Sequence, residues 1–262
     1  MEIIVCVKHV PEVAEVELRI DKSGRDIDRS GLVYDINEWD DYAVEEAIRI
    51  KEKFGGNVTV VTIGDENSDS TLRKCLAKGA DKAIRITDKR INSSDPFIVA
   101  KVLSETLKKI SFDLILTGVQ SSDDGYAMVG PALAELLGIP HVTMAKKIEI
   151  KDNSIIVNRE LEGGLGEVVE IEMPALITVQ TGINEPRYVS IMGIKKAMKK
   201  EIRILSIDDL GLNEEEVGVD NSWLQIMEMY IPPVERRAEF IKGNPEEVAS
   251  KIVEIIKSRG LI

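Results

Sequence analysis

The strongest candidate for a chemical site is the polar, glycine-bracketed loop over residues 118–125. It follows an apolar run at residues 114–116 and precedes a stretch that predicts a helix over residues 126–137. Backbone N–H groups at a helix start attract anions, and the hydroxyls of Ser121 and Ser122 would add donors. The spacing therefore fits the phosphates of a nucleotide, and it fits a plain capped connection between strand and helix about as well.

The same loop carries two adjacent carboxylates, Asp123 and Asp124. Their charge would repel a bare anion. A carboxylate in the first turn of a helix can instead cap that helix and order the loop before it. The two aspartates therefore leave both interpretations of the loop open.

The cysteines and histidines do not form a metal or disulfide pattern. Cys6 and Cys75 lie in apolar surroundings without CxxC spacing, and His9 and His141 lie far apart in the sequence. A cysteine such as Cys6, within an apolar run, most often packs as a small hydrophobic side chain.

Apolar runs alternate with amphipathic helices along the first two thirds of the chain. The runs that predict buried parallel strands are residues 3–7, 58–63, 83–86, 114–116 and 174–179. The helices expected between them are residues 37–53, 70–78, 95–109 and 126–137, with Asn37 as a good N-cap of the first. This alternation predicts an α/β fold with a doubly wound, mostly parallel sheet.

The pattern changes after Pro140. Short alternating segments at residues 146–151, 154–161 and 167–172, with turn residues between them, predict an antiparallel hairpin region on one sheet edge. Residues 15–34 predict an extended excursion, and an acidic, proline-containing stretch after Leu212 predicts an extended arm with a terminal helix over residues 245–259. We expect a domain over residues 1–205 and an arm over residues 206–262 that wraps a partner.

Charge and composition limit the partners of the chain. Its 262 residues carry a formal net charge of −12, and no basic stripe with interleaved aromatic residues is present, so nucleic acid is not an expected partner. No apolar run approaches the length of a bilayer span, and the amino terminus lacks the pattern of a signal peptide. We therefore expect a cytoplasmic protein without direct membrane insertion.

Several motifs in order resemble one family. The stretch Val157-Asn158-Arg159-Glu160-Leu161-Glu162-Gly163-Gly164, the strand at 174–179, Asn184-Glu185-Pro186-Arg187-Tyr188 and the lysine run at 195–200 are similar to electron transfer flavoprotein beta subunits. Upstream, Val7-Lys8, the helix at 37–53 and Lys78-Gly79-Ala80-Asp81 also fit. The resemblance covers residues 1 to 200 closely and residues 232–236 loosely, and it implies a sheet of the adenine nucleotide alpha hydrolase-like type.

The resemblance implies an adenine nucleotide, FAD or AMP, at the carboxyl ends of the strands, and no side-chain nucleophile or acid–base pair. Carried over position by position, the pocket comprises Cys6, Asn37, Glu38, Trp39, Asp40, Val60, Val61, Thr62, Ile63, Gly118, Gln120, Ser121, Ser122, Asp123, Asp124, Gly125, Tyr126, Ala127, Met128 and Val129.

The choice between FAD and AMP stays open at this point. Val129-Gly130-Pro131 is similar to the flavin-bifurcating members of the family, which hold a second FAD in this subunit. Glycine and alanine between residues 125 and 130 would leave room for a flavin tail. In contrast, Ser121-Ser122-Asp123-Asp124 departs from the alanine-isoleucine-aspartate pattern of the well-known groups.

The resemblance also implies partners. Residues 188–198 are similar to the loop through which these proteins engage redox partners, with Ile191 at the position of the family's protruding leucine. Exposed Ile191 and Met192 followed by Lys195 and Lys196 would give an apolar anchor within a steering charge field; alternatively, Ile191 and Met192 pack inward. The implied partners are an alpha subunit, a dehydrogenase or quinone-reducing partner, and NADH as an electron donor.

A rival interpretation is an ATP- or AMP-sensing module of similar sheet topology without redox activity. Such modules tend to carry a glycine-rich phosphate motif for ATP, which this sequence does not show, and their fold would not call for the long arm after Leu212.

Overall fold

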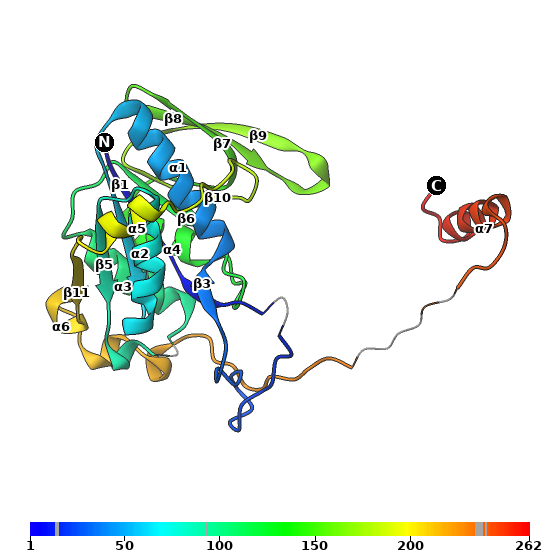
Figure 1. The fold of residues 1–262 in the computed structure, drawn as a ribbon, viewed down its shortest axis with the longest axis horizontal. Coiled ribbons are helices and arrows are strands. Elements are labelled where there is room, and N and C mark those ends of the chain that lie inside the picture. Colours follow the sequence, from blue (N-terminus) through cyan, green and yellow to red (C-terminus); the bar gives the residue numbers. More distant parts are fainter. Residues whose placement is uncertain (14–15, 93, 234–237, 239) are drawn as a thin grey trace.

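The computed structural model describes residues 1–262 except 14–15, 93, 234–237 and 239 (Figure 1). The family-like positions 234–236 therefore lie outside the described residues. Within the described part of the chain, no helix is long and apolar enough to cross a membrane.

A nine-stranded sheet forms the centre of the fold, in the order β11-β5-β4-β1-β6-β10-β7-β8-β9. Its strands are β1 (Glu2–Cys6), β4 (Asn57–Ile63), β5 (Lys82–Ile86), β6 (Leu114–Gly118), β7 (His141–Lys151), β8 (Ser154–Glu160), β9 (Gly166–Glu172), β10 (Ala175–Val179) and β11 (Ile202–Leu205). The pairs from β11 to β7 are parallel, and β7, β8 and β9 pair antiparallel. The predicted mostly parallel sheet with an antiparallel edge is confirmed.

Helices cover both faces of the sheet, which explains the continuous apolar runs of its central strands. The helices are α1 (Glu38–Phe54), α2 (Asp69–Lys78), α3 (Pro96–Leu107), α4 (Val129–Leu137), α5 (Ile191–Ala197), α6 (Ile207–Leu210) and α7 (Pro245–Ser258). Short 3₁₀ turns are η1 (Glu66–Ser68), η2 (Lys89–Ile91), η3 (Glu162–Gly164), η4 (Glu214–Glu216) and η5 (Val219–Asn221).

Successive side chains of β1 enter two separate hydrophobic cores. Ile3 and Val5 pack with residues of α1 and α2, whereas Ile4 and Cys6 pack with residues of α3 and α4. This alternation follows from the two-residue period of a strand. The strand is packed against a hydrophobic core on each face, and this packing fixes the position of its carboxyl end.

The structure corrects the predicted start of the helix after the polar loop. Helix α4 begins at Val129 and not at residue 126. Gly125 and Ala127 both have positive φ, 63° and 54°, which no right-handed helix accommodates. The N–H groups of this helix start therefore lie further from Gln120 than the sequence indicated.

The sequence predicted β7 only in part, as residues 146–151, and it did not predict β2 (His9–Pro11), β3 (Tyr34–Ile36) and β11 as strands. Strand β7 begins at His141, because its first half runs parallel to β10 and only its second half alternates as a hairpin strand. Strand β11 adds a parallel edge beside β5. Strands β2 and β3 form a small antiparallel sheet that brackets the predicted excursion.

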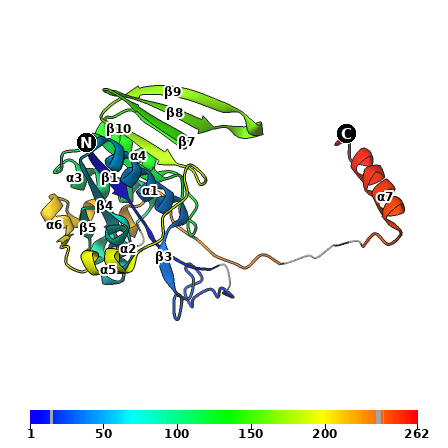
Figure 2. The ribbon, with the colours of Figure 1, turned by 45° about the horizontal axis from the view of Figure 1, so that its top comes forward.

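The carboxyl-terminal arm starts from a firm anchor on α3. The Asp95 carboxylate caps α3 through Ile98 N–H at 2.9 Å and also accepts bonds from the N–H groups of Trp223 and Leu224, at 2.8 and 3.1 Å. The Trp223 ring stacks on Phe97 with centroids 4.5 Å apart. Beyond this anchor the chain runs outward to α7, which lies apart from the sheet in both views and buries none of its residues (Figures 1 and 2). The predicted extended arm is confirmed.

Candidate functional site

The order in which strands are added to the sheet reverses at β1. The candidate site lies at the carboxyl end of that strand. Strands β4, β5 and β11 follow on one side of β1, and β6, β10 and β7 follow on the other. In open α/β sheets, ligands bind in the crevice outside the strand ends at such a switch point. Cys6 ends β1, and Gly118 ends the neighbouring β6.

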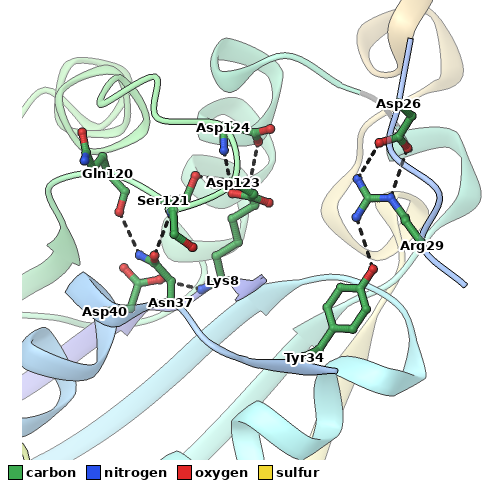
Figure 3. A network of polar contacts seen from close by, with 11 residues as sticks. Lys8, Asp26, Arg29, Tyr34, Asn37, Asp40, Gln120, Ser121, Asp123 and Asp124 are labelled. Atoms are coloured by element: carbon green, nitrogen blue, oxygen red, sulfur yellow. Dashed lines mark hydrogen bonds and ion pairs between the residues drawn. The ribbon is translucent and has the colours of Figure 1, made fainter. Parts of the chain in front are cut away.

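Asn37 fixes the polar loop to the start of α1. Its side-chain amide donates to the Gln120 carbonyl at 2.8 Å, and its carbonyl oxygen accepts from Ser122 N–H at 3.0 Å (Figure 3). The residue stands at the N-cap position, as predicted, but its side chain does not cap the helix. Its amide group is used instead to hold a loop that lies far away in the sequence.

Asp40 ties the ends of β1 and β6 together. One carboxylate oxygen accepts from Lys8 N–H at 2.7 Å, and the other accepts from Gly118 N–H at 2.9 Å. The residue is buried, and this burial raises its pKa to about 7 against the lowering influence of the two N–H groups and of the Lys8 charge. Burial, with the nearby Asp40 charge, likewise raises the pKa of the Cys6 thiol to about 12, so Cys6 stays protonated at neutral pH.

We expect the raised pKa of Asp40 to give the wild-type protein a pH-dependent loss of stability. The folded-state pKa of about 7 exceeds the unfolded-state value near 3.8, so folding takes up a proton between those values. Stability is lost as pH rises through this window, by about 4 kcal/mol over the whole window and by about 2.5 kcal/mol of that between pH 5 and pH 8. Urea unfolding of wild type and Asp40→Asn from pH 5 to 8 tests this. We expect the free energy of unfolding of wild type to fall relative to that of the variant as pH rises.

His9 acts in the opposite direction in that experiment. Its burial lowers the pKa of the imidazole, so its contribution to stability rises with pH. Because His9 is present in both proteins, the difference between them isolates Asp40. A pH-independent difference would contradict the prediction.

Lys8 is the site residue that sequence reasoning missed, having noted it only within a family-like motif. Its ammonium donates to Asp123 at 2.7 Å, to Asp124 at 2.5 Å and to Ser121 Oγ at 3.4 Å (Figure 3). Burial opposes the ionisation of Asp123, yet the Lys8 charge holds the pKa of this carboxyl below its usual value. The available signal was the position of Lys8, the first charged residue after a buried strand.

The structure brings one part of the predicted set together and leaves another part elsewhere. Asn37, Asp40, Gly118, Gln120, Ser121, Ser122, Asp123 and Asp124 meet around Lys8. The side chains of Val60 and Val61 enter the two hydrophobic cores. Trp39 donates its indole N–H to Gln180 at 2.9 Å, at the end of β10.

The remaining predicted residues lie at the rim of the site. Glu38, Gly125 and Ala127 are exposed, as are the large side chains of Tyr126 and Met128. Ile63 and Val129 are half-buried. The Thr62 hydroxyl, at the end of β4, is buried without a hydrogen-bond partner in the described part of the chain.

The predicted partner-recognition residues lie on the surface around α5. The side chains of Ile191 and Met192 are 76% and 67% exposed, so they do not pack inward. Ser190 caps the helix through Gly193 N–H at 3.0 Å, and Lys195 and Lys196 follow on its exposed last turn.

Comparisons with known proteins agree on one family. The model of the electron transfer flavoprotein domain matches residues 25–210. The chain is 43% identical over 260 residues to the electron transfer flavoprotein subunit beta of Methylophilus methylotrophus, covering 98% of each chain. It is 41% identical to the subunit beta of Thermoanaerobacterium thermosaccharolyticum and 36% identical to the caffeyl-CoA reductase-Etf complex subunit CarD of Acetobacterium woodii, each over the full length of both chains. The chain therefore belongs to the electron transfer flavoprotein family, as a beta subunit.

Proposed function

We propose that this beta subunit holds an adenine nucleotide, preferentially FAD and alternatively AMP, at the switch point between β1 and β6. With an alpha subunit, it carries electrons from NADH or a dehydrogenase to a further redox acceptor. Family membership favours this function over that of a nucleotide sensor without redox activity.

The observation that carries the proposal is the anchoring of the polar loop at the strand ends. Asn37 holds the loop by two hydrogen bonds, and Asp40 joins the strands that flank it. The loop thereby presents the hydroxyl of Ser121 beside the Lys8 ammonium, and Ser122 follows it on the exposed side of the loop. Hydroxyl, amide and ammonium donors form a set that fits phosphate oxygens.

The rim of the site fits the aromatic part of such a ligand. Tyr126 and Met128 expose large apolar surfaces directly after the loop. Nucleotide sites combine such surfaces with a small number of placed polar groups.

The preference for FAD rests on space at Gly125 and Ala127. A side-chain carbon at Gly125 would meet nothing within 4 Å, which leaves room for a longer ligand. Gly130 does not contribute to this room, because a side-chain carbon there would lie 2.6 Å from Thr178 Cγ2 on β10. Its glycine allows α4 to pack closely on the sheet.

FAD, when bound, supplies the capacity to accept and release electrons. The residues of the chain would bind and orient it: the loop donors would hold its phosphates, and the buried Asp40 keeps the two strand ends at a fixed separation. The Cys6 thiol remains neutral at physiological pH, so it serves packing and takes no part as a thiolate.

Partner recognition is assigned to the surface around α5, defined as Tyr188, Ile191, Met192, Lys195 and Lys196. Three large apolar side chains stand exposed there beside two lysines. Apolar anchors surrounded by charge combine affinity with electrostatic steering.

The arm is assigned to the alpha subunit. Helix α7 exposes Ile252, Val253 and Ile255, and it lies well away from the sheet (Figure 2). An amphipathic helix without a core of its own needs another surface to cover its apolar side chains. We propose the division into a nucleotide-binding unit over residues 1–205 and an arm over residues 206–262. The first part of this arm packs on the core through Ile207, Leu210 and Val217, and the part beyond the Trp223 anchor is the one assigned to the partner.

The test is to count nucleotides in the complex with the alpha subunit. The full chain is co-expressed with that subunit, the complex is denatured, and the released ligands are separated by chromatography. We expect two FAD, or one FAD and one AMP, per heterodimer. Release of a single FAD without a second adenine nucleotide would overturn the proposal.

A matched pair of variants assigns the ligand to this site. Asn37→Ala removes the two bonds through which Asn37 holds the loop, so we expect the second nucleotide to fall to less than about a tenth of its wild-type occupancy. Asn153→Ala, in the exposed turn between β7 and β8, is the control and retains it. Equal occupancy in the two variants would contradict the assignment.

A further inference from the structure

We propose that Asp123 and Asp124 compete with the phosphate of the bound nucleotide for the Lys8 ammonium. The carboxylates of the loop thereby weaken the binding of phosphate to the same loop. Lys8 then determines the preference for phosphorylated over unphosphorylated adenosine compounds. This inference rests on the proposed function and adds the regulation of the same site.

The Lys8 ammonium is saturated by the loop. A lysine ammonium has three N–H donors, and Asp123, Asp124 and Ser121 accept three bonds from it (Figure 3). A phosphate that engages Lys8 must therefore displace one of these partners. Of the two carboxylates, Asp124 leaves more readily, because its side chain is 49% exposed against 18% for Asp123.

The backbone of Lys8 is fixed while its side chain can turn. Its N–H donates to Asp40 at 2.7 Å, and its carbonyl accepts from Asn37 N–H at 2.9 Å. Exchange between carboxylate and phosphate thus requires only side-chain rotation and movement of the loop tip, where Gly125 and Ala127 have positive φ. The strand ends that define the site stay in place.

Lys8 is the positive charge for which the two carboxylates and a phosphate would compete. In the described part of the chain, the only ion pairs of Asp123 and Asp124 are those with Lys8. Arg29, the other basic residue labelled in Figure 3, is bound to Asp26 and Tyr34. Without Lys8, a phosphate in this loop would face two uncompensated carboxylates.

The opposing interpretation is that the two aspartates only order the loop around Lys8. The two interpretations predict opposite signs for Asp124→Asn. Loss of an ordering contact weakens the binding of AMP, whereas loss of a competitor strengthens it.

The experiment measures affinities of the nucleotide-depleted heterodimer for radiolabelled AMP and adenosine by equilibrium dialysis. For Asp124→Asn we expect AMP affinity to rise about 3- to 10-fold with adenosine affinity unchanged. For Lys8→Gln we expect AMP affinity to fall about 10-fold or more and adenosine affinity to change less than about 2-fold.

Two controls test for non-specific charge effects. Lys101→Gln and Asp208→Asn each remove one member of an ion pair distant from the loop, with Glu216 and Arg90 respectively. Neither is expected to change the ratio of AMP to adenosine affinity. Thermal unfolding of every variant confirms that the compared proteins are folded at the temperature of dialysis.

The outcomes separate the inference from the proposed function. Unchanged or weaker AMP binding by Asp124→Asn, or an equal loss of AMP and adenosine by Lys8→Gln, overturns the inference alone. A wild-type heterodimer that binds neither ligand overturns the proposed function and the inference with it.

Discussion

Replacing Gly118 by alanine is expected to destabilise the protein by about 3 kcal/mol and to remove the nucleotide from the complex. A side-chain carbon at this position would lie 2.5 Å from Asp40 Oδ1, 2.6 Å from Trp39 Cβ and 3.0 Å from the Asp40 backbone nitrogen. Trp39 Cβ and the Asp40 nitrogen belong to the first turn of α1 and cannot move without moving the helix, and the Asp40 oxygen can turn away only by giving up its bond to Gly118 N–H. The substitution therefore forces α1 away from the end of β6.

The second cost of this substitution is electrostatic. Moving α1 breaks the bond from Gly118 N–H to the Asp40 carboxylate, which measures 2.9 Å. A buried carboxylate that loses a donor incurs a desolvation penalty of about 1–3 kcal/mol. The Asn37 amide moves with the same helix, so the polar loop loses its anchor together with the strand end.

Urea unfolding and nucleotide release measure the two effects. Gly166→Ala is the matched control, because its nearest new contact is the Arg159 carbonyl at an ordinary 3.6 Å and its φ is not in the left-handed region. We expect the control to lie within about 0.5 kcal/mol of wild type. If Gly118→Ala were as stable as the control, α1 could move away from the end of β6 at little energetic cost, and the prediction would be wrong.

The central strands were predictable because each one is marked by its own short run of apolar residues. The residues at 3–6 and 114–116 are apolar without interruption, and a parallel strand covered on both faces requires this. Strand β11 gave no such signal, since Arg203 and Ile204 on this sheet edge are exposed. The short strands β2 and β3 carry too few residues to display a period.

The start of α4 could not be predicted from composition. The sequence from Tyr126 onward suits a helix, but the positive φ of Ala127 is a conformation that alanine adopts only under tertiary constraint. The loop that precedes α4 is held by Asn37 and Lys8, residues 85 and 115 positions away from the loop residues they bind. Tertiary contacts thus override local propensity here.

Some candidate site residues could be predicted from the sequence, whereas the tertiary contacts between them could not. Residue types and spacing indicated the loop, and the family resemblance indicated Asn37 and Asp40. The bonds that connect them to Lys8 join segments distant in sequence, and no spacing rule encodes such a pair. Lys8 therefore becomes visible only when the switch point of the sheet brings the end of β1 beside the end of β6.

Replacing Arg187 by methionine is expected to destabilise the protein by about 3 kcal/mol. The Glu45 side chain is only 4% exposed and accepts from Arg187 three times, from the backbone N–H at 3.0 Å, from Nε at 2.9 Å and from Nη2 at 3.1 Å. Removing the guanidinium leaves this buried carboxylate without its main partner. Glu52, which Arg187 also binds at 2.6 Å, is half-exposed and loses little.

The same substitution should weaken partner recognition. Arg187 immediately precedes Tyr188 and joins the surface around α5 to helix α1. With the guanidinium gone, we expect this surface to sample more conformations, so the KM for the redox partner rises about 5-fold while kcat changes less than about 2-fold. Steady-state reduction assays with increasing partner concentration, run well below the unfolding temperature, measure this split.

Two further variants decide whether the buried charge is the cause. Arg49→Met removes a half-exposed arginine that approaches Glu45 only to 3.6 Å, so its cost should stay below about 1 kcal/mol. Combining Glu45→Gln with Arg187→Met removes the unpaired charge, so it should restore part of the stability lost in Arg187→Met without restoring the KM, because the clamp between α1 and the partner surface is still absent. Recovery of both quantities together would show that Arg187 acts on recognition only through stability, and recovery of neither would show that the charge of Glu45 is not what destabilises the single variant.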